Sequence, residues 1–144
     1  MMSIFGEIGV GRILIAGAVS AVTAVVIEWV VVAWLFHDYQ RLTPASWRPE
    51  GPREYFLSTC VTLASGFAFA VLFAMTGSTL TSRMGHGLPA GLLFGLACFV
   101  ALPLPVILSQ AIFVNLHRGF VAGLLLNSLL FCITCGVICA MLIA

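Results

Sequence analysis

The chain has 144 residues, of which 62% are hydrophobic and 8% are charged, and its formal net charge is +1. Soluble domains carry about 25% charged residues, so this composition excludes a water-exposed globular fold and indicates an integral membrane protein. The six positive charges are scattered arginines. Because no basic run is available to follow a phosphate backbone, nucleic acid is excluded as a partner.

Four apolar segments are long enough to cross a bilayer as helices, which takes about 20 residues. They are residues 11–36, 55–77, 88–114 and 120–144. The connections between them are short, so consecutive helices must run in opposite directions. The sequence therefore predicts an all-α fold, an antiparallel bundle of four transmembrane helices in a single domain, 1–144. The first run is too long for a signal peptide, and we expect it to stay as the first span.

Glu28 is the one acid inside the first span. A charged acid at the centre of a spanning helix costs about 2.5 to 3.5 kcal/mol on insertion scales. Gly17, Ala21 and Ala24 precede it at spacings of four, three and four residues, which is one helix face. Helices in lipid associate through faces of small residues. We therefore expect Glu28 to point toward protein.

The other three spans carry small-residue faces of the same kind. They contain Gly66 and Ala70 in the second span, Gly91 and Gly95 in the third, and Gly123 in the fourth. Such faces predict close helix packing, either inside the bundle or along an oligomer seam.

Glu28 is predicted to belong to a polar layer. Counting residues inward from the ends of the spans places Thr62 and Asn127 at its depth, ~12 Å inside the membrane. Pro103 and Pro105 lie just deeper and free backbone carbonyls four residues earlier. Glu28 would then bond to Asn127, to Thr62 or to a freed carbonyl. The layer is interpreted either as a structural clasp or as a proton-linked site, because intramembrane ionisable groups are candidates for function.

The first loop, residues 37–54, is the main polar segment. Aromatic residues bracket it: Trp34, Tyr39, Trp47 and Tyr55. This pattern predicts an interfacial aromatic belt, with a lid over a site or a contact for a partner protein as the alternative. Loops 37–54 and 115–119 share one side and hold four of the six arginines: Arg41, Arg48, Arg53 and Arg118. The positive-inside rule therefore predicts that both loops are cytoplasmic.

Cys132 and Cys135 form a C-x-x-C motif on the fourth span. It is similar to the redox motif of the vitamin K epoxide reductase family, which is also a four-helix membrane bundle. That resemblance implies a second, loop-borne cysteine pair, and no loop here contains a cysteine. We therefore predict inert packing cysteines and no enzymatic activity. His37, His86 and His117 lie in or beside loops without a ligand signature, so no metal or cofactor is predicted.

Two family resemblances add expectations. A small four-span chain with a glutamate in the first span resembles the small multidrug resistance transporters. They work as dimers and exchange protons for a cationic drug through that acid, which implies a coupling role for Glu28. The chain also resembles uncharacterised small four-span bacterial inner-membrane proteins, a likeness that implies the fold and a bacterial inner membrane but no activity. It is carried by Trp29, Trp34, Trp47, Gly91, Pro103 and Asn127.

Small-residue faces on all four helices exceed what one compact bundle needs. We therefore predict a non-enzymatic subunit or scaffold that packs in the lipid bilayer against itself or a larger membrane complex. The alternative is a proton-coupled, small-multidrug-resistance-like transporter, whose mark would be a water-accessible cavity reaching Glu28. A further alternative is a lipid- or quinone-binding protein with its groove beside the Pro103 kink.

Overall fold

The computed structural model describes residues 9–47, 51–84 and 87–143, and within these ranges the regular structure is entirely helical. Four of the described helices are long and apolar enough to cross a membrane. The predicted all-α class and the number of candidate spans are therefore confirmed. Arg48 and His86, which entered the sequence arguments, lie outside the described residues, as does Ala144.

The helices follow one another in a simple order. They are α2 (Val10–Glu28), η1 (Trp29–Leu35), η2 (His37–Leu42), η3 (Pro44–Ser46), α3 (Pro52–Met84), α4 (Leu88–Ala101), α5 (Pro103–Phe113) and α6 (Arg118–Leu142). The main departure from expectation is α3, which has 33 residues and begins at Pro52. Proline lacks a backbone N–H and suits the first turn of a helix, so Pro52 starts α3 and shortens the predicted loop.

The first span changes its winding at Glu28. Residues Val10–Glu28 are α-helical, whereas Trp29–Leu35 form a π-helix, η1. The N–H of Phe36 donates to the carbonyl of Val31, five residues earlier. A π-helix is rare and often marks a functional site, because its wider turn re-aims the side chains that follow. The sequence pattern did not predict this change.

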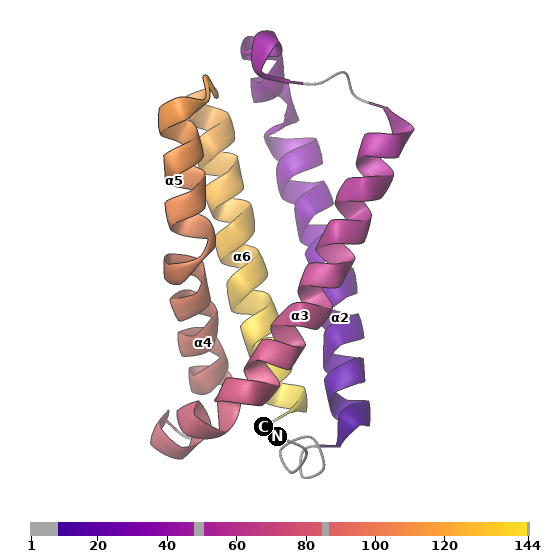
Figure 1. Cartoon of the computed structure of the whole chain (residues 1–144), viewed down its shortest axis with the longest axis vertical. Coiled ribbons are helices and arrows are strands. Elements are labelled where there is room, and N and C mark those ends of the chain that lie inside the picture. Colours follow the sequence, from indigo (N-terminus) through magenta and orange to yellow (C-terminus); the bar gives the residue numbers. More distant parts are fainter. Residues whose placement is uncertain (1–8, 48–50, 85–86, 144) are drawn as a thin grey trace.

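The four spans pack as two close pairs, α2 with α3 and α4 with α6, and α2 also contacts α6 (Figure 1). Glycines allow the two helices of each pair to approach closely. A Cβ added at Gly66 of α3 would overlap the backbone of Ala21 on α2. A Cβ at Gly91 of α4 would lie 2.6 Å from the Val137 Cα of α6. The small-residue faces named from the sequence therefore pack inside one chain.

The same holds for the remaining small residues of those faces. A Cβ at Gly17 would meet the Phe67 ring at 2.5 Å, and one at Gly95 would overlap the Cys132 carbonyl. Ala24 and Ala70 are buried. Substituting any of these glycines would force two helices apart.

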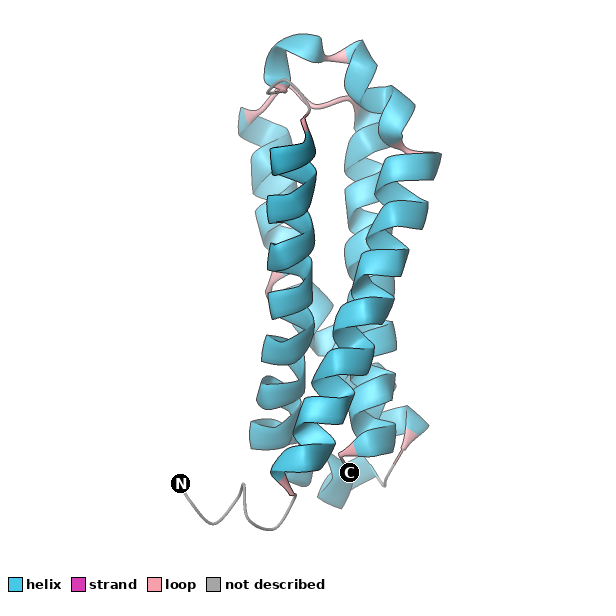
Figure 2. Ribbon diagram, turned by 90° about the vertical axis from the view of Figure 1, so that its right-hand side faces the viewer, coloured by secondary structure: helices cyan, strands magenta, loops and turns pink. Residues whose placement is uncertain are grey.

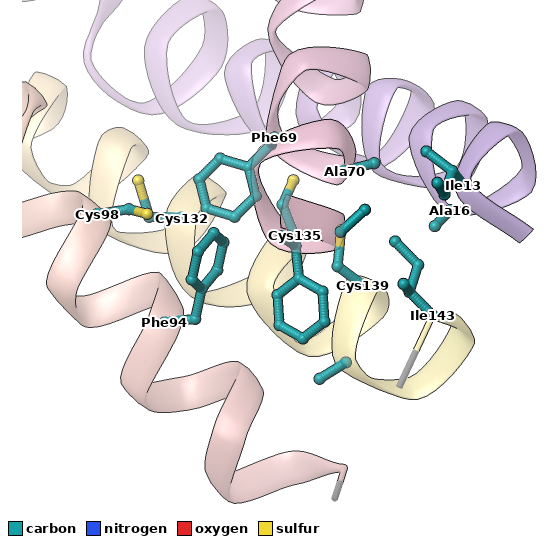
Figure 3. Close-up of a cluster of buried hydrophobic side chains, with 13 residues drawn as sticks. Ile13, Ala16, Phe69, Ala70, Phe94, Cys98, Cys132, Cys135, Cys139 and Ile143 are labelled. Atoms are coloured by element: carbon teal, nitrogen blue, oxygen red, sulfur yellow. The ribbon is translucent and has the colours of Figure 1, made fainter. Parts of the chain in front are cut away.

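The hydrophobic core lies at the end of the bundle where α2 begins and α6 ends. Figure 3 shows Phe69 of α3 and Phe94 of α4 beside the cysteines of α6. The Phe69 and Phe94 rings meet edge to face with centroids 5.1 Å apart. Ile13 and Ile143, at the two ends of the chain's helices, belong to the same buried cluster. This half of the bundle is tightly packed.

The opposite end is more open. There α3 leans away from η1, and the short helices η2 and η3 bridge the helix ends (Figures 1 and 2). The first turns of α3 are exposed, including Tyr55 and Phe56. The packing therefore changes from a closed core to an open end along the length of α3.

Candidate functional site

A pocket of about 440 Å³ lies at the open end, between η1, the first loop and the first turns of α3. Small-molecule sites in proteins have volumes of about 300 to 1,000 Å³, so the pocket is of the right size for a small ligand. Its walls combine acids, hydroxyls and aromatic rings. The lining residues are Glu28, Trp29, Val32, Ala33, His37, Gln40, Ser46, Trp47, Glu54, Tyr55, Ser58 and Thr59.

Glu28 lies in the wall of this pocket and is held by two hydroxyl groups of α3. Ser58 Oγ donates to Glu28 Oε1 at 2.8 Å, and Thr62 Oγ1 donates to Glu28 Oε2 at 2.5 Å. Ser58 and Thr62 are four residues apart, so they share one face of α3. Both carboxyl oxygens therefore accept a hydrogen bond from a hydroxyl group of α3.

The charged side chains in the pocket wall are both acidic. They are Glu28 and Glu54, and His37 is the one titratable base among the described lining residues. Asp38 and Arg41, on the neighbouring helix η2, are largely exposed and pair with each other at 3.3 Å. The described wall of the pocket therefore combines two acids with one imidazole, and the two acids favour a cation as the ligand.

Three aromatic residues complete the pocket: Trp29 of η1, Trp47 of the first loop and Tyr55 of α3. Aromatic faces attract cations, and their apolar bodies pack against the hydrocarbon part of a ligand. Trp34 differs from these three because 78% of its surface is exposed. Trp34 thus fits the predicted interfacial belt, whereas Trp47 points inward.

The first loop forms one wall of the pocket and is fastened to the start of α6. The Trp47 ring meets Phe120 edge to face with centroids 4.7 Å apart. Ser46 Oγ donates to the Asn115 carbonyl at 2.6 Å. These contacts hold the loop across the bundle.

A second set of contacts fastens the loop nearer to η2. The Tyr39 ring stacks on His117 with centroids 5.0 Å apart, and His117 Nδ1 accepts the N–H of Gly119 at 3.1 Å. A Cβ at Gly119 would collide with the Tyr39 ring, so glycine is required for the stack to form. The loop therefore has the position of a lid, which was the alternative to a purely interfacial segment.

The predicted polar layer is only partly assembled. Glu28 and Thr62 meet, as described above. Asn127 does not bond to Glu28 through its carbonyl oxygen, because its Oδ1 is buried without a hydrogen-bond partner. Of the alternative partners predicted for Glu28, Thr62 is the one that bonds to it, and Ser58 of the same helix is a second donor.

The proline kink also lies apart from Glu28. The third span breaks at Leu102, between α4 and α5, with Pro103 as the first residue of α5. Helix α5 packs against α4 and α6. Pro103 and Pro105 therefore shape the third span, and both Glu28 oxygens accept from hydroxyl groups of α3 instead of donating to the freed carbonyls.

The cysteines of the fourth span lie in the closed core. Cys132, Cys135 and Cys139 are buried free thiols. Cys135 Sγ donates to the Ser20 carbonyl at 3.7 Å, and the Ser20 hydroxyl lies 3.8 Å from Cys139 Sγ. These contacts join α6 to α2. Within the described part of the chain, no group of three or more His, Cys, Asp or Glu side chains is placed to hold a metal ion.

Sequence reasoning missed several pocket residues, above all Ser58 and Glu54. A signal was present, because Glu54, Ser58 and Thr62 recur every four residues and therefore share one face of α3. Depth counting selected Thr62 from this row and passed over its neighbours. The position of His37, Gln40 and Ser46 in the pocket wall depends on how the loop folds back, which no spacing rule predicts.

Scans of protein-family models, curated proteins and solved structures gave no match to this chain.

Proposed function

We propose that this chain is a multi-pass protein of the bacterial inner membrane whose four spans cross the bilayer as an antiparallel bundle. The length and hydropathy of the four helices support the crossing. The distribution of arginines supports a cytoplasmic location for loops 37–54 and 115–119. In this orientation the pocket opens on the cytoplasmic side, with Glu28 at its inner end.

We further propose that the protein is a proton-linked carrier of a small organic cation. The observation that supports this function is the pocket of about 440 Å³ whose wall includes Glu28, an acid within the first span. An intramembrane acid is costly and is placed where it binds a cation or a proton. The resemblance to small multidrug resistance transporters implies the same role for this acid.

The proposed exchange uses Glu28 alone as the charged group. In the cation-bound state its carboxylate pairs with the ligand, while Ser58 and Thr62 keep their hydrogen bonds to its two oxygens. When the cation leaves, a proton takes its place and neutralises the acid, which lowers the cost of holding it at membrane depth. The same site therefore holds one positive charge at a time.

The other two functions lack comparable support. The small-residue faces that motivated a scaffold are occupied within one chain, as at Gly66 against Ala21 and at Gly91 against Val137. A lipid or quinone site was expected beside Pro103, whereas the pocket lies at Glu28. The carrier is therefore the function that we favour.

The first experiment measures binding of benzyltrimethylammonium, whose charge is fixed, to the protein in nanodiscs. Tryptophan fluorescence is a direct readout because Trp29 and Trp47 line the pocket. We expect saturable quenching that Glu28→Gln weakens at least about tenfold, the scale of one charge-assisted contact. Asp38→Asn is the matched control, because Asp38 is exposed and does not line the pocket.

The second experiment measures transport in proteoliposomes that carry a pH gradient. Uptake of the same cation should follow the gradient and stop in Glu28→Gln. Unchanged binding in Glu28→Gln would refute the pocket as the cation site. Binding without uptake would refute the carrier and leave only a binding protein.

A further inference from the structure

Glu54 is the second acid in the pocket wall, and the proton exchange proposed above does not use it. It lies in the first turn of α3 and is exposed. Its side chain folds back over Gly51, since a Cβ added at Gly51 would lie 2.7 Å from Glu54 Oε2. The Glu54 carboxylate therefore faces the outer end of α3, away from Glu28.

The two carboxylates belong to different levels of the pocket wall. Ser58, which donates to Glu28 Oε1, is four residues further along α3 than Glu54. Four residues of α-helix rise about 6 Å, and the outward direction of Glu54 adds to this separation, giving roughly 6 to 10 Å. Over most of this range one ammonium group cannot contact both carboxylates at once.

The space between the two acids is apolar and aromatic. Trp29, Val32 and Ala33 come from η1, and Trp47 and Tyr55 from the loop and α3. Such walls accept a hydrocarbon chain, and the aromatic faces also attract an ammonium group. The pocket wall therefore combines two acids with apolar and aromatic surface that can contact a hydrocarbon chain.

We propose that the ligand of this pocket is an aliphatic diamine of about four to eight carbons, one ammonium group at Glu28 and the other at Glu54. The inference rests on the proposed function, because the first ammonium group occupies the cation site at Glu28. Glu54 makes the pocket prefer a diamine to a monoamine. A diamine neutralises both acids, whereas a monoamine leaves Glu54 unpaired.

The test is displacement of benzyltrimethylammonium from the protein in nanodiscs, followed by tryptophan fluorescence. The competitors are α,ω-diamines and primary monoamines of matched chain length. For the wild type we expect one optimal diamine length and about fivefold tighter binding of that diamine than of its monoamine, the size of one exposed charge contact. This advantage should shrink at high salt, because salt screens exposed charges.

Glu54→Gln should remove the advantage of the diamine, so that the ratio of the diamine affinity to the monoamine affinity falls from about five to about one. Glu54 is exposed, so this variant is expected to fold. Asp38→Asn, which removes an acid outside the pocket, should keep the full advantage.

The outcomes separate the two proposals. A wild type that binds both amines equally, or a Glu54→Gln variant that retains the diamine advantage, would overturn the diamine inference while the cation site at Glu28 stands. Unchanged binding of benzyltrimethylammonium in Glu28→Gln would overturn the proposed function and the diamine inference with it.

Discussion

Thr62 Oγ1 on α3 donates a hydrogen bond to Glu28 Oε2 at 2.5 Å, at the residue where the first span changes from an α-helix to a π-helix. Ser58, one turn earlier on α3, donates to the other oxygen. In the proposed membrane span little water is available to a carboxyl group, and these two hydroxyls supply hydrogen bonds in its place. They also fix the acid at the inner end of the pocket.

Replacing Thr62 with valine keeps the shape of the side chain and removes the donor. We expect the free energy of unfolding to fall by about 1.5 to 3 kcal/mol, the range for a hydrogen bond to a charged group. Denaturant unfolding in detergent micelles measures this change. Thr76→Val is the control, because the Thr76 hydroxyl bonds only to the Leu72 carbonyl of its own helix. Equal losses in the two variants would contradict a special role for Thr62.

For Asn127 the expected change in the free energy of unfolding has the opposite sign. Its Oδ1 is buried without a partner. Removing an unpaired buried acceptor relieves a desolvation cost, so Asn127→Leu should raise the free energy of unfolding by about 1 kcal/mol. The same denaturant titration checks this. A loss of stability would show that Asn127 has a bonded partner in the membrane.

Gly66 is expected to tolerate no side chain. Its Cβ would overlap the Ala21 backbone, so Gly66→Ala must push α3 away from α2 and should cost about 1 to 3 kcal/mol. Gly11→Ala is the matched control, because nothing lies within 4 Å of a Cβ there and the change should be neutral or slightly stabilising. Thermal unfolding of both variants in the same micelle compares them. Similar melting temperatures would argue against the close α2–α3 contact.

Trp47 should contribute to ligand binding, because this residue of the first loop forms part of the pocket wall. Trp47→Ala removes one pocket wall and the contact with Phe120, and we expect benzyltrimethylammonium to bind about fivefold to tenfold more weakly. Trp34→Ala is the control, because Trp34 is exposed and does not line the pocket. Trp29 remains as the fluorescent reporter in both variants. A stronger effect at Trp34 than at Trp47 would place the ligand outside the pocket.

Thiol labelling should separate the cysteines by burial. Cys60 is exposed on α3, whereas Cys135 and Cys139 have no exposed surface. In micelles a membrane-permeant maleimide should modify Cys60 first and leave the buried thiols intact until the protein is unfolded in SDS. Mass spectrometry of the labelled peptides reads the order. Rapid modification of Cys135 in the folded protein would contradict its burial in the core and the prediction of inert packing cysteines.

The sequence by itself determined the class of fold. Four apolar runs of spanning length with few charges leave the helix as the main way to satisfy backbone hydrogen bonds, so helix number and approximate bounds followed from composition. The small-residue spacing also selected the faces that pack, including Gly17, Gly66 and Gly91. Depth counting placed Thr62 at the level of Glu28, because rise per residue is fixed along a helix.

Only the tertiary structure decided what those faces meet and where the pocket lies. Helical spacing gives the direction of a side chain on its own helix and carries no information on which helix stands opposite. For this reason the sequence left Asn127, Thr62 and a backbone carbonyl open as partners of Glu28, whereas the structure shows Thr62 and Ser58 of α3 as its donors. The π-helical turn at Trp29, the lean of α3 and the fastening of Trp47 to Phe120 depend on contacts between segments far apart in the chain. Because of those contacts, Glu28, the one acid of the first apolar run, lies in the wall of a pocket.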